Sequence, residues 1–395
     1  MMRLTYRNIN YLLFALYNFV YIFYMCGYIN RVIYMGCLGV FFAFQILQYI
    51  IIKKRKENTL FEKEFKTALC IVVSMLFVSL IIQARNDDFE SYLFEELLYF
   101  IVPPLTAYCC INNGKNKDVE MFIYIIFAKL ALYFMLRYGN TISLDAIRQI
   151  TFSDSNSSLY ENVIAHDFMI LLIVFDYLKK YKTATVSFVL CFLCFKRLPF
   201  LLSTVIFIAM CLQWFSHNVK LQKKLDHAAR WWNGDVPNVI IYSVALIWIC
   251  LPFVMQWIYS DEGNIWFTRT FNMSLNEYTS GRYNIVNYAL ENFKFNGLGS
   301  ITAAFENSMI AEYRRVGNMH CDVIRLFKEV TIIGYSVYII CILKVFSKNR
   351  VLFGMLLYIL LELAISHMAD NLNIWTIMYL FAAYFTPRKE LKDVQ

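Results

Sequence analysis

The stretch from residue 276 to residue 334 reads NEYTSGRYNIVNYALENFKFNGLGSITAAFENSMIAEYRRVGNMHCDVIRLFKEVTIIG, and most of it lies in a long polar segment between hydrophobic runs. Apolar residues recur at helical spacing after Ser280-Gly281-Arg282, at Ile285, Val286, Ala289, Leu290 and Phe293. The run Asn296-Gly297-Leu298-Gly299 interrupts them, and a second apolar stripe follows at Ile301, Phe305, Met309, Tyr313 and Val316. The pattern predicts two amphipathic helices that lie along a membrane surface.

The composition around this stretch is that of a membrane protein. The chain has 395 residues, of which 59% are hydrophobic and 17% charged, and the mean hydropathy is +0.49. Its net charge of +8 does not indicate a nucleic-acid partner, because the lysines and arginines lie mostly in short loops between apolar runs. The 11 cysteines lie almost all inside those runs, where a cysteine behaves as a small hydrophobic residue, so no disulfide framework or zinc site is indicated. A cleavable signal peptide is not expected, because the first apolar run has the length of a membrane span.

Apolar runs of membrane-spanning length predict an all-α polytopic membrane protein with about twelve transmembrane helices. The predicted spans are residues 11–29, 32–52, 66–84, 92–111, 119–138, 161–178, 183–195, 198–215, 236–258, 322–343, 351–367 and 372–386. We expect a single integral membrane domain over residues 1–395, with a long loop at 259–321 that holds the amphipathic helices. The spans show no internal repeat of the kind that many secondary transporters contain.

The lysines and arginines orient these spans. One alternating set of connections holds more than twice as many of them as the other set, although the other set includes the 259–321 loop. Since positive residues favour the cytoplasmic side, both termini are predicted to be cytoplasmic and the 259–321 loop external.

Two arginines are candidates for anion binding. Arg282 follows Ser-Gly at the start of a predicted surface helix, where a guanidinium fork and free helix amides both favour a phosphate. Arg197 lies in the tight external turn Lys196-Arg197-Leu198-Pro199, at a predicted helix N-terminus. For each arginine, an interfacial side chain that contacts lipid headgroups is an equal alternative.

His320 is the candidate general base, because an imidazole can take up a proton near neutral pH. A lone histidine is more often structural than catalytic. Asp322 is expected to cap the following helix, and Arg325 and Glu329 have the i,i+4 spacing of an ion pair inside the span. Arg314 and Arg315 precede the histidine and are further cationic candidates.

Other charged residues are weaker candidates. Asp87, Asp88 and Glu90 form an acidic cluster that could hold a divalent metal, although a solvated loop is the simpler interpretation. Asp145, Asp154 and Glu161 flank a polar external loop. Charged groups in or near the spans are expected to line an internal cavity, with no partners assigned: Glu95, Glu96, Lys129, His166, Asp167, Glu362 and His367.

Together these features resemble the Wzy-type O-antigen and capsule repeat-unit polymerases, which are relatives of the O-antigen ligases. The resemblance covers about residues 156–334 and consists of the Lys196-Arg197 turn, the loop that opens with Thr279-Ser280-Gly281-Arg282, the Gly297-Leu298-Gly299 run, and His320 followed by Glu329 and Gly334. These motifs are short, and their order and membrane side give them weight. The His-Asn pair of the family is His320-Cys321 here, which is a departure.

The resemblance implies a membrane glycosyltransferase of the GT-C fold in the bacterial cytoplasmic membrane. It implies undecaprenyl-pyrophosphate-linked oligosaccharides as donor and acceptor at the outer leaflet of the bilayer, and transfer of the growing chain with inversion of the anomeric centre. Arg197 and Arg282 are then expected to bind the pyrophosphate, and His320 to activate the acceptor hydroxyl. No cofactor or metal is implied, and a chain-length regulator is a candidate protein partner.

Three other classes are alternatives. An O-antigen ligase-type transferase shares the motifs and differs in its acceptor. A lipid-linked oligosaccharide flippase or other transporter shares the span number, but it does not need an external loop with arginine and histidine. A membrane O-acyltransferase also uses histidine, but no acyl-donor motif is visible.

Overall fold

The structure is a computed structural model that describes residues 6–55, 59–114, 116–139, 164–194, 196–215, 232, 234–279, 281–308 and 319–386. The described residues form α-helices and connecting segments without any strand. A helix lies at each of the twelve predicted spans. Among the described helices, seven are long and apolar enough to cross a membrane. The chain is therefore a helical membrane protein, and the long apolar runs of its sequence are the physical reason.

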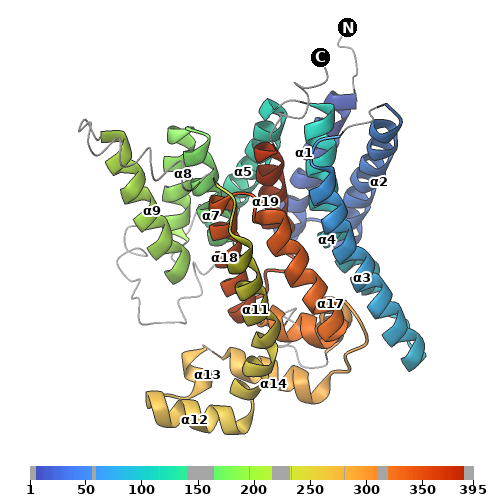
Figure 1. Cartoon of the computed structure of the whole chain (residues 1–395), viewed down its shortest axis with the longest axis vertical. Coiled ribbons are helices and arrows are strands. Elements are labelled where there is room, and N and C mark those ends of the chain that lie inside the picture. Colours follow the sequence, from blue (N-terminus) through green and yellow to red (C-terminus); the bar gives the residue numbers. More distant parts are fainter. Residues whose placement is uncertain are drawn as a thin grey trace. The chain divides into compact units, whose positions relative to one another are not determined.

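The seven long apolar helices are α2 (Arg31–Arg55), α3 (Glu62–Asn86), α4 (Tyr92–Asn113), α5 (Asn116–Tyr138), α9 (Arg197–Phe215), α11 (Asn238–Ile258) and α17 (Asp322–Phe346) (Figure 1). The other five helices at predicted spans are α1 (Tyr6–Met25), α7 (Ile164–Tyr177), α8 (Tyr181–Leu193), α18 (Arg350–Ile365) and α19 (Leu372–Phe385).

By its internal contacts, the chain divides into two compact units. The single integral membrane domain that the composition predicts remains a prediction. The first unit contains residues 1–62, 103–231 and 373–395, and the second contains residues 63–102 and 232–372. The boundary inside α4 falls between Val102 and Pro103.

In the first unit, α1 packs against α2 and α5, and α7 packs against α5, α8 and α9. Its core is aromatic: the ring of Phe14 lies 4.3 Å from Phe122 and 5.6 Å from Phe41, measured between centroids. The 5.6 Å distance lies within the range of about 4.5–7 Å for aromatic pairs that stabilise a core beyond the area they bury, and the 4.3 Å distance is slightly shorter.

In the second unit, α17 packs against α11, α18 and α15 (Ser300–Glu306). Three further helices follow α11 along the chain: α12 (Asp261–Phe271), α13 (Leu275–Tyr278) and α14 (Arg282–Asn292) (Figure 1). The first predicted amphipathic stripe forms α14. The second stripe begins as α15, but this helix ends at Glu306, and residues 309–318 lie outside the described residues.

The Gly297-Leu298-Gly299 run makes a tight turn because it packs directly on two helices. Gly297 and Gly299 have φ angles of +95° and +86°, which favour glycine. A Cβ on Gly299 would lie 2.9 Å from the carbonyl carbon of Tyr92 on α4. The amide of Leu298 donates to the hydroxyl of Ser79 on α3 at 3.0 Å. These contacts hold the start of α15 inside the unit, so that α15 is largely buried rather than half exposed.

Helix α17 is broken at Thr331, which has a φ of +59°. A β-branched residue is strained in this region, at a cost of about 1–3 kcal/mol, and such strain persists only where the surrounding contacts hold it. Contacts lie on both sides of this break: Tyr335 donates to the carbonyl of Trp248 at 3.2 Å on the C-terminal half, and the N-terminal half carries the charged residues of the candidate site.

Candidate functional site

Asp322, Arg325 and Glu329 are fully buried on the first turns of α17. Such charges are costly inside a membrane helix and mark functional or structurally essential positions. Their contacts show which groups stabilise each of them.

Asp322 does not cap α17, which differs from the sequence-based expectation. The N-cap residue is Cys321, and it makes no side-chain capping bond. The Asp322 carboxylate instead accepts hydrogen bonds from the amides of Met368 and Ala369, the second at 2.7 Å. The amide of Asp322 donates to the carbonyl of Ser366 at 3.2 Å. The start of α17 is thereby joined to the segment that follows α18.

Arg325 is the central cation of the buried cluster. Its Nε lies 2.9 Å from Oδ1 of Asp322, and its Nη1 lies 3.2 Å from Oε1 of Glu96 on α4. Thr302 on α15 donates to the same Glu96 oxygen at 2.8 Å. We call Glu96, Thr302, Asp322, Arg325 and Glu329 the buried charge cluster. It links α4, α15 and α17.

Glu329 does not pair with Arg325 as the i,i+4 spacing predicts. Its Oε1 accepts from the amide of Ile301 at 2.9 Å and from the hydroxyl of Ser300 at 3.4 Å. Because α15 has no side-chain cap of its own, the Glu329 carboxylate supplies one from the neighbouring helix. Within the described part of the chain, Nη2 of Arg325 and Oε2 of both Glu96 and Glu329 make no hydrogen bond. These three side-chain groups of the buried charge cluster can therefore form further hydrogen bonds within the second unit.

His320 forms a pair with His367. Their Nδ1 atoms are 3.1 Å apart, and their ring centroids are 4.8 Å apart. A hydrogen bond between two ring nitrogens requires one to donate and the other to accept, so the pair shares one proton. A group that shares a proton in this way can pass it between two rings, which suits a general base.

Arg282 is the first residue of α14, and its Nη1 donates to the carbonyl of Ile365 at 2.7 Å. In the part of the chain that the structure describes, no carboxylate forms an ion pair with Arg282. The guanidinium therefore keeps donors for an anion. Tyr259, whose ring stacks on Tyr283 at 6.0 Å, lies near it. Burial raises the pKa of the Tyr259 phenol above its usual range, and the charge of Arg282 opposes this rise.

The segment from Ile365 to His367 brings these two side chains together. Arg282 contacts its first residue and His320 contacts its last. Asp322 is bonded to the residues just after it. A cation, a histidine pair and the buried charge cluster thus meet at the end of α18 in one unit.

A pocket of about 430 Å³ opens in the same unit, and we call it the polar pocket. Its lining includes acids, amides and aromatic rings: Asp88, Glu90, Asn292, Asn296, Tyr288 and Phe293. Asn296 is fixed by its contacts, because its amide group donates to the carbonyl of Asp88 at 2.8 Å and accepts from Asn86 at 2.8 Å. Ser300 also lines the pocket and contacts Glu329, which joins the pocket to the buried charge cluster.

Arg197 and Lys196 lie in the first unit. Arg197 is the first residue of α9 and is exposed, as the turn before Pro199 predicts. Arg314 and Arg315 lie outside the described residues, as do Asp145, Asp154 and Glu161. Lys129 donates to the side chain of Asn373 in the first unit, and its ammonium lies 4.4 Å from the ring centroid of Tyr21.

Cys321, the residue after His320, is fully buried. Burial raises the pKa of its thiol to about 12. The thiol is therefore neutral at physiological pH and is not a nucleophile. The acidic cluster at Asp87, Asp88 and Glu90 shows no metal-binding geometry, since no group of three or more potential ligands occurs among the described residues.

Sequence reasoning named Glu96 and His367 without giving them partners, and it missed Thr302 and the carbonyl of Ile365. His367 lies just after an apolar run and shortly before Asp370, and this position was a local signal that it belongs to a polar site. No local signal pairs Glu96 with Arg325, because they lie far apart in the sequence and meet only through helix packing.

Comparisons with known proteins add no relative: no protein-family model, no curated protein and no solved structure matches this chain.

Proposed function

We propose that this chain is a membrane glycosyltransferase that polymerises undecaprenyl-pyrophosphate-linked oligosaccharide repeat units at the outer leaflet, for O-antigen or capsular polysaccharide. The observation that supports this most is the convergence of Arg282 and His320 on residues 365–367. The reaction needs a cation for the leaving pyrophosphate and a base for the acceptor hydroxyl, and these two side chains supply them.

In the proposed reaction, the acceptor hydroxyl oxygen attacks the anomeric carbon of the donor sugar. The bond from that carbon to the pyrophosphate oxygen breaks, and the pyrophosphate leaves with the electron pair. His320 takes the hydroxyl proton, while its bond to His367 orients the ring. Arg282 stabilises the charge that develops on the leaving group. Attack opposite to the leaving group inverts the anomeric centre.

The polar pocket supports a carbohydrate substrate. Amide and carboxylate groups exchange hydrogen bonds with sugar hydroxyls, and the rings of Tyr288 and Phe293 offer apolar faces. Its link to Glu329 through Ser300 connects a bound sugar to the helix that His320 precedes.

The proposal includes the finer membrane topology. We propose twelve spans in a GT-C arrangement, both termini in the cytoplasm and the 259–321 loop outside the cytoplasmic membrane, as the distribution of lysines and arginines favours. Reporter fusions near Lys54, Lys224 and the C-terminus are expected to be cytoplasmic. Fusions near Asn276 and Glu306 are expected to be external, and a cytoplasmic signal from them contradicts the mechanism.

Arg197 is proposed as a second pyrophosphate-binding residue, by resemblance to the family. Its exposure at the start of α9 and the absence of an acidic partner among the described residues support this role.

The direct test uses the purified protein with a synthetic lipid-linked repeat unit, with chelator present to remove adventitious metal. The wild type is expected to form long polymer. His320→Ala should lower the rate by about 10²–10⁴-fold, and Arg282→Ala by about 10²–10³-fold. Arg282→Lys should recover only part of the activity, because an ammonium does not reproduce the guanidinium fork.

Arg269→Ala is the matched control, since Arg269 is an exposed arginine at the end of α12. Normal polymer from His320→Ala would show that the histidine is structural. Transfer to a lipid-core acceptor without polymer would identify a ligase instead. Movement of intact lipid-linked units across a vesicle membrane, with no new glycosidic bond, would identify a flippase.

A further inference from the structure

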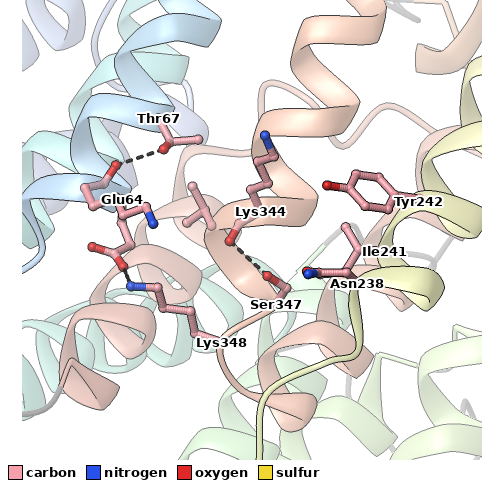
Figure 2. A pocket seen from close by; sticks show the side chains of 10 residues that line it. Glu64, Thr67, Asn238, Ile241, Tyr242, Lys344, Ser347 and Lys348 are labelled. Atoms are coloured by element: carbon pink, nitrogen blue, oxygen red, sulfur yellow. Dashed lines mark hydrogen bonds and ion pairs between the residues drawn. The ribbon is translucent and has the colours of Figure 1, made fainter.

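A second pocket, with a volume of about 270 Å³, lies where three candidate spans of the second unit meet. We call it the lysine pocket. Its lining includes Lys63 and Glu64 from the start of α3, Asn238 and Tyr242 from the start of α11, Lys344 from the last turn of α17, and Lys348 just after that helix. Figure 2 shows the Lys348–Glu64 pair on one side of this pocket and Tyr242 on the other.

Contacts between the helix ends hold the lysine pocket in shape. The amide of Val236, just before α11, donates to the carbonyl of Ser347 at 2.9 Å. The amide of Arg350 donates to the carbonyl of Gly234 at 3.1 Å. The ion pair between Lys348 and the nearly buried carboxylate of Glu64 joins α17 to α3. These contacts connect the three helix ends directly and give the pocket its shape.

The charges of the lysine pocket do not cancel. Lys348 neutralises Glu64, but no acidic side chain in the described ranges pairs with Lys63 or Lys344, and both are exposed. The hydroxyl of Tyr242 and the amide of Asn238 also make no hydrogen bond within those ranges. Two ammonium groups with additional neutral donors match the oxygens of a phosphate group.

The surroundings of the pocket favour a lipid as the source of that phosphate. Helices α3, α11 and α17 are long and apolar enough to cross a membrane, and the pocket lies at their ends, where headgroups are found. Next to it, α11 exposes the apolar side chains of Val239, Ile240 and Leu246, of which Val239 is 75% exposed. An acyl chain can follow this face while its phosphate occupies the lysine pocket.

We propose that the lysine pocket binds the phosphate group of an anionic phospholipid. Helix α17, which is broken at Thr331, runs from the histidine pair to the lysine pocket. His320 immediately precedes one end, and the lysine pocket lies at the other. In the proposed topology, the loop that holds His320 is external and the segment after α17 is cytoplasmic, so the lipid binds at the opposite membrane face from the histidine pair and joins α3, α11 and α17 there. This site does not depend on the reaction that the chain performs.

Native mass spectrometry of the detergent-solubilised full chain tests the proposal, with phosphatidylglycerol and phosphatidylcholine as probes. The wild type is expected to bind phosphatidylglycerol in preference. Lys63→Ala/Lys344→Ala should bind it about thirtyfold more weakly, because each lysine near an anionic headgroup contributes roughly fivefold. The control Lys117→Ala/Lys182→Ala removes the same charge at exposed lysines outside the pocket and should bind as the wild type does.

The charge-preserving variant Lys63→Arg/Lys344→Arg covers the case in which the alanine variant does not fold, and it should retain the preference. Equal binding of phosphatidylglycerol by the wild type and the alanine variant overturns the proposal. In a separate titration, inorganic phosphate should not raise the melting temperature of the wild type as phosphatidylglycerol does. If inorganic phosphate raises the melting temperature of the wild type but not of the alanine variant, the pocket binds phosphate. The proposal that a phospholipid supplies this phosphate is then overturned.

Discussion

The two ends of α17 carry charge in opposite ways. At the N-terminal end, Asp322, Arg325 and Glu329 are fully buried and each contacts a group on another segment. At the C-terminal end, Lys344 and Lys348 are exposed, and Lys344 has no acidic partner among the described residues. The N-terminal end uses all three charges to hold helices together, whereas at the C-terminal end Lys348 pairs with Glu64 and Lys344 stays available.

This difference has a physical cause. A buried ion needs partners, because desolvation costs several kcal/mol per ion and only close contacts offset it. An exposed ion keeps its water and can exchange it for a ligand at a small cost. Removal of a buried charge should therefore damage the fold, whereas removal of an exposed one should change mainly what binds.

Arg325→Met is expected to have the largest effect on stability. It leaves Asp322 and Glu96 buried without their cation, which typically costs 3–5 kcal/mol. The thermal unfolding midpoint in detergent and the amount of protein in the membrane should both fall. Arg85→Met, at an exposed arginine in the last turn of α3, is the matched control and should change little. A stable Arg325→Met protein would mean that the buried charge cluster does not hold the helices.

Lys348→Ala should have an intermediate effect. The Glu64 side chain is only 6% exposed, while that of Lys348 is 53% exposed. We expect a loss of about 1–2 kcal/mol, between the values for exposed and buried pairs. Adding Glu64→Gln should recover part of it, which a double-mutant cycle measures. Lys53→Ala, whose partner Glu62 is 25% exposed, is the comparison and should cost less. The contrast fails if both lysine variants lose equal stability.

The helices were predictable from sequence because long apolar runs can satisfy their backbone only as helices in a membrane. The short helices α12 and α13 were missed, although their signals were present. Ser260 caps α12, and Ser274 with Glu277 forms a capping box on α13. These signals are weak beside an apolar stripe, and α13 has only four residues.

The candidate site was predictable only in part. Arg282 and His320 were named from local chemistry and family order, and the structure places both against residues 365–367. The roles of Asp322 and Glu329 were not predictable. Their partners are backbone amides at Ala369 and Ile301, which belong to other segments and have no sequence signature. Sequence spacing alone therefore predicted a partner within α17 for each carboxylate: the helix N-terminus for Asp322 and Arg325 for Glu329.

His367→Ala tests the histidine pair at the same end of α17. It removes one hydrogen bond to His320, which is worth about 1.4 kcal/mol or tenfold in rate. If His367 positions the proposed base, kcat of the proposed polymerisation should fall about tenfold while KM for the proposed lipid-linked donor stays near the wild-type value. His367→Asn, which keeps a polar group there, should recover part of the rate. A rise in KM with unchanged kcat would assign His367 to substrate binding instead.

Glu277 should show the smallest effect, because it is exposed and stabilises only α13. Its carboxylate accepts from the hydroxyl of Ser274 at 2.9 Å and from the amide of Ser274 at 3.0 Å. These bonds hold the pKa of Glu277 below its usual range. A depressed folded-state pKa gives stability that is present above the unfolded pKa, about 4.5, and is lost as the pH falls through the folded value. Hydrogen exchange of the amides of Leu275–Tyr278, corrected for intrinsic rates, should therefore speed up on acidification in the wild type and not in Glu277→Gln.

Glu291→Gln, on exposed Glu291 of α14, should retain the wild-type response. If Glu277→Gln shows the same acid response, a group other than Glu277 opens α13 on acidification. The bonds of this exposed carboxylate would then not be what stabilises α13.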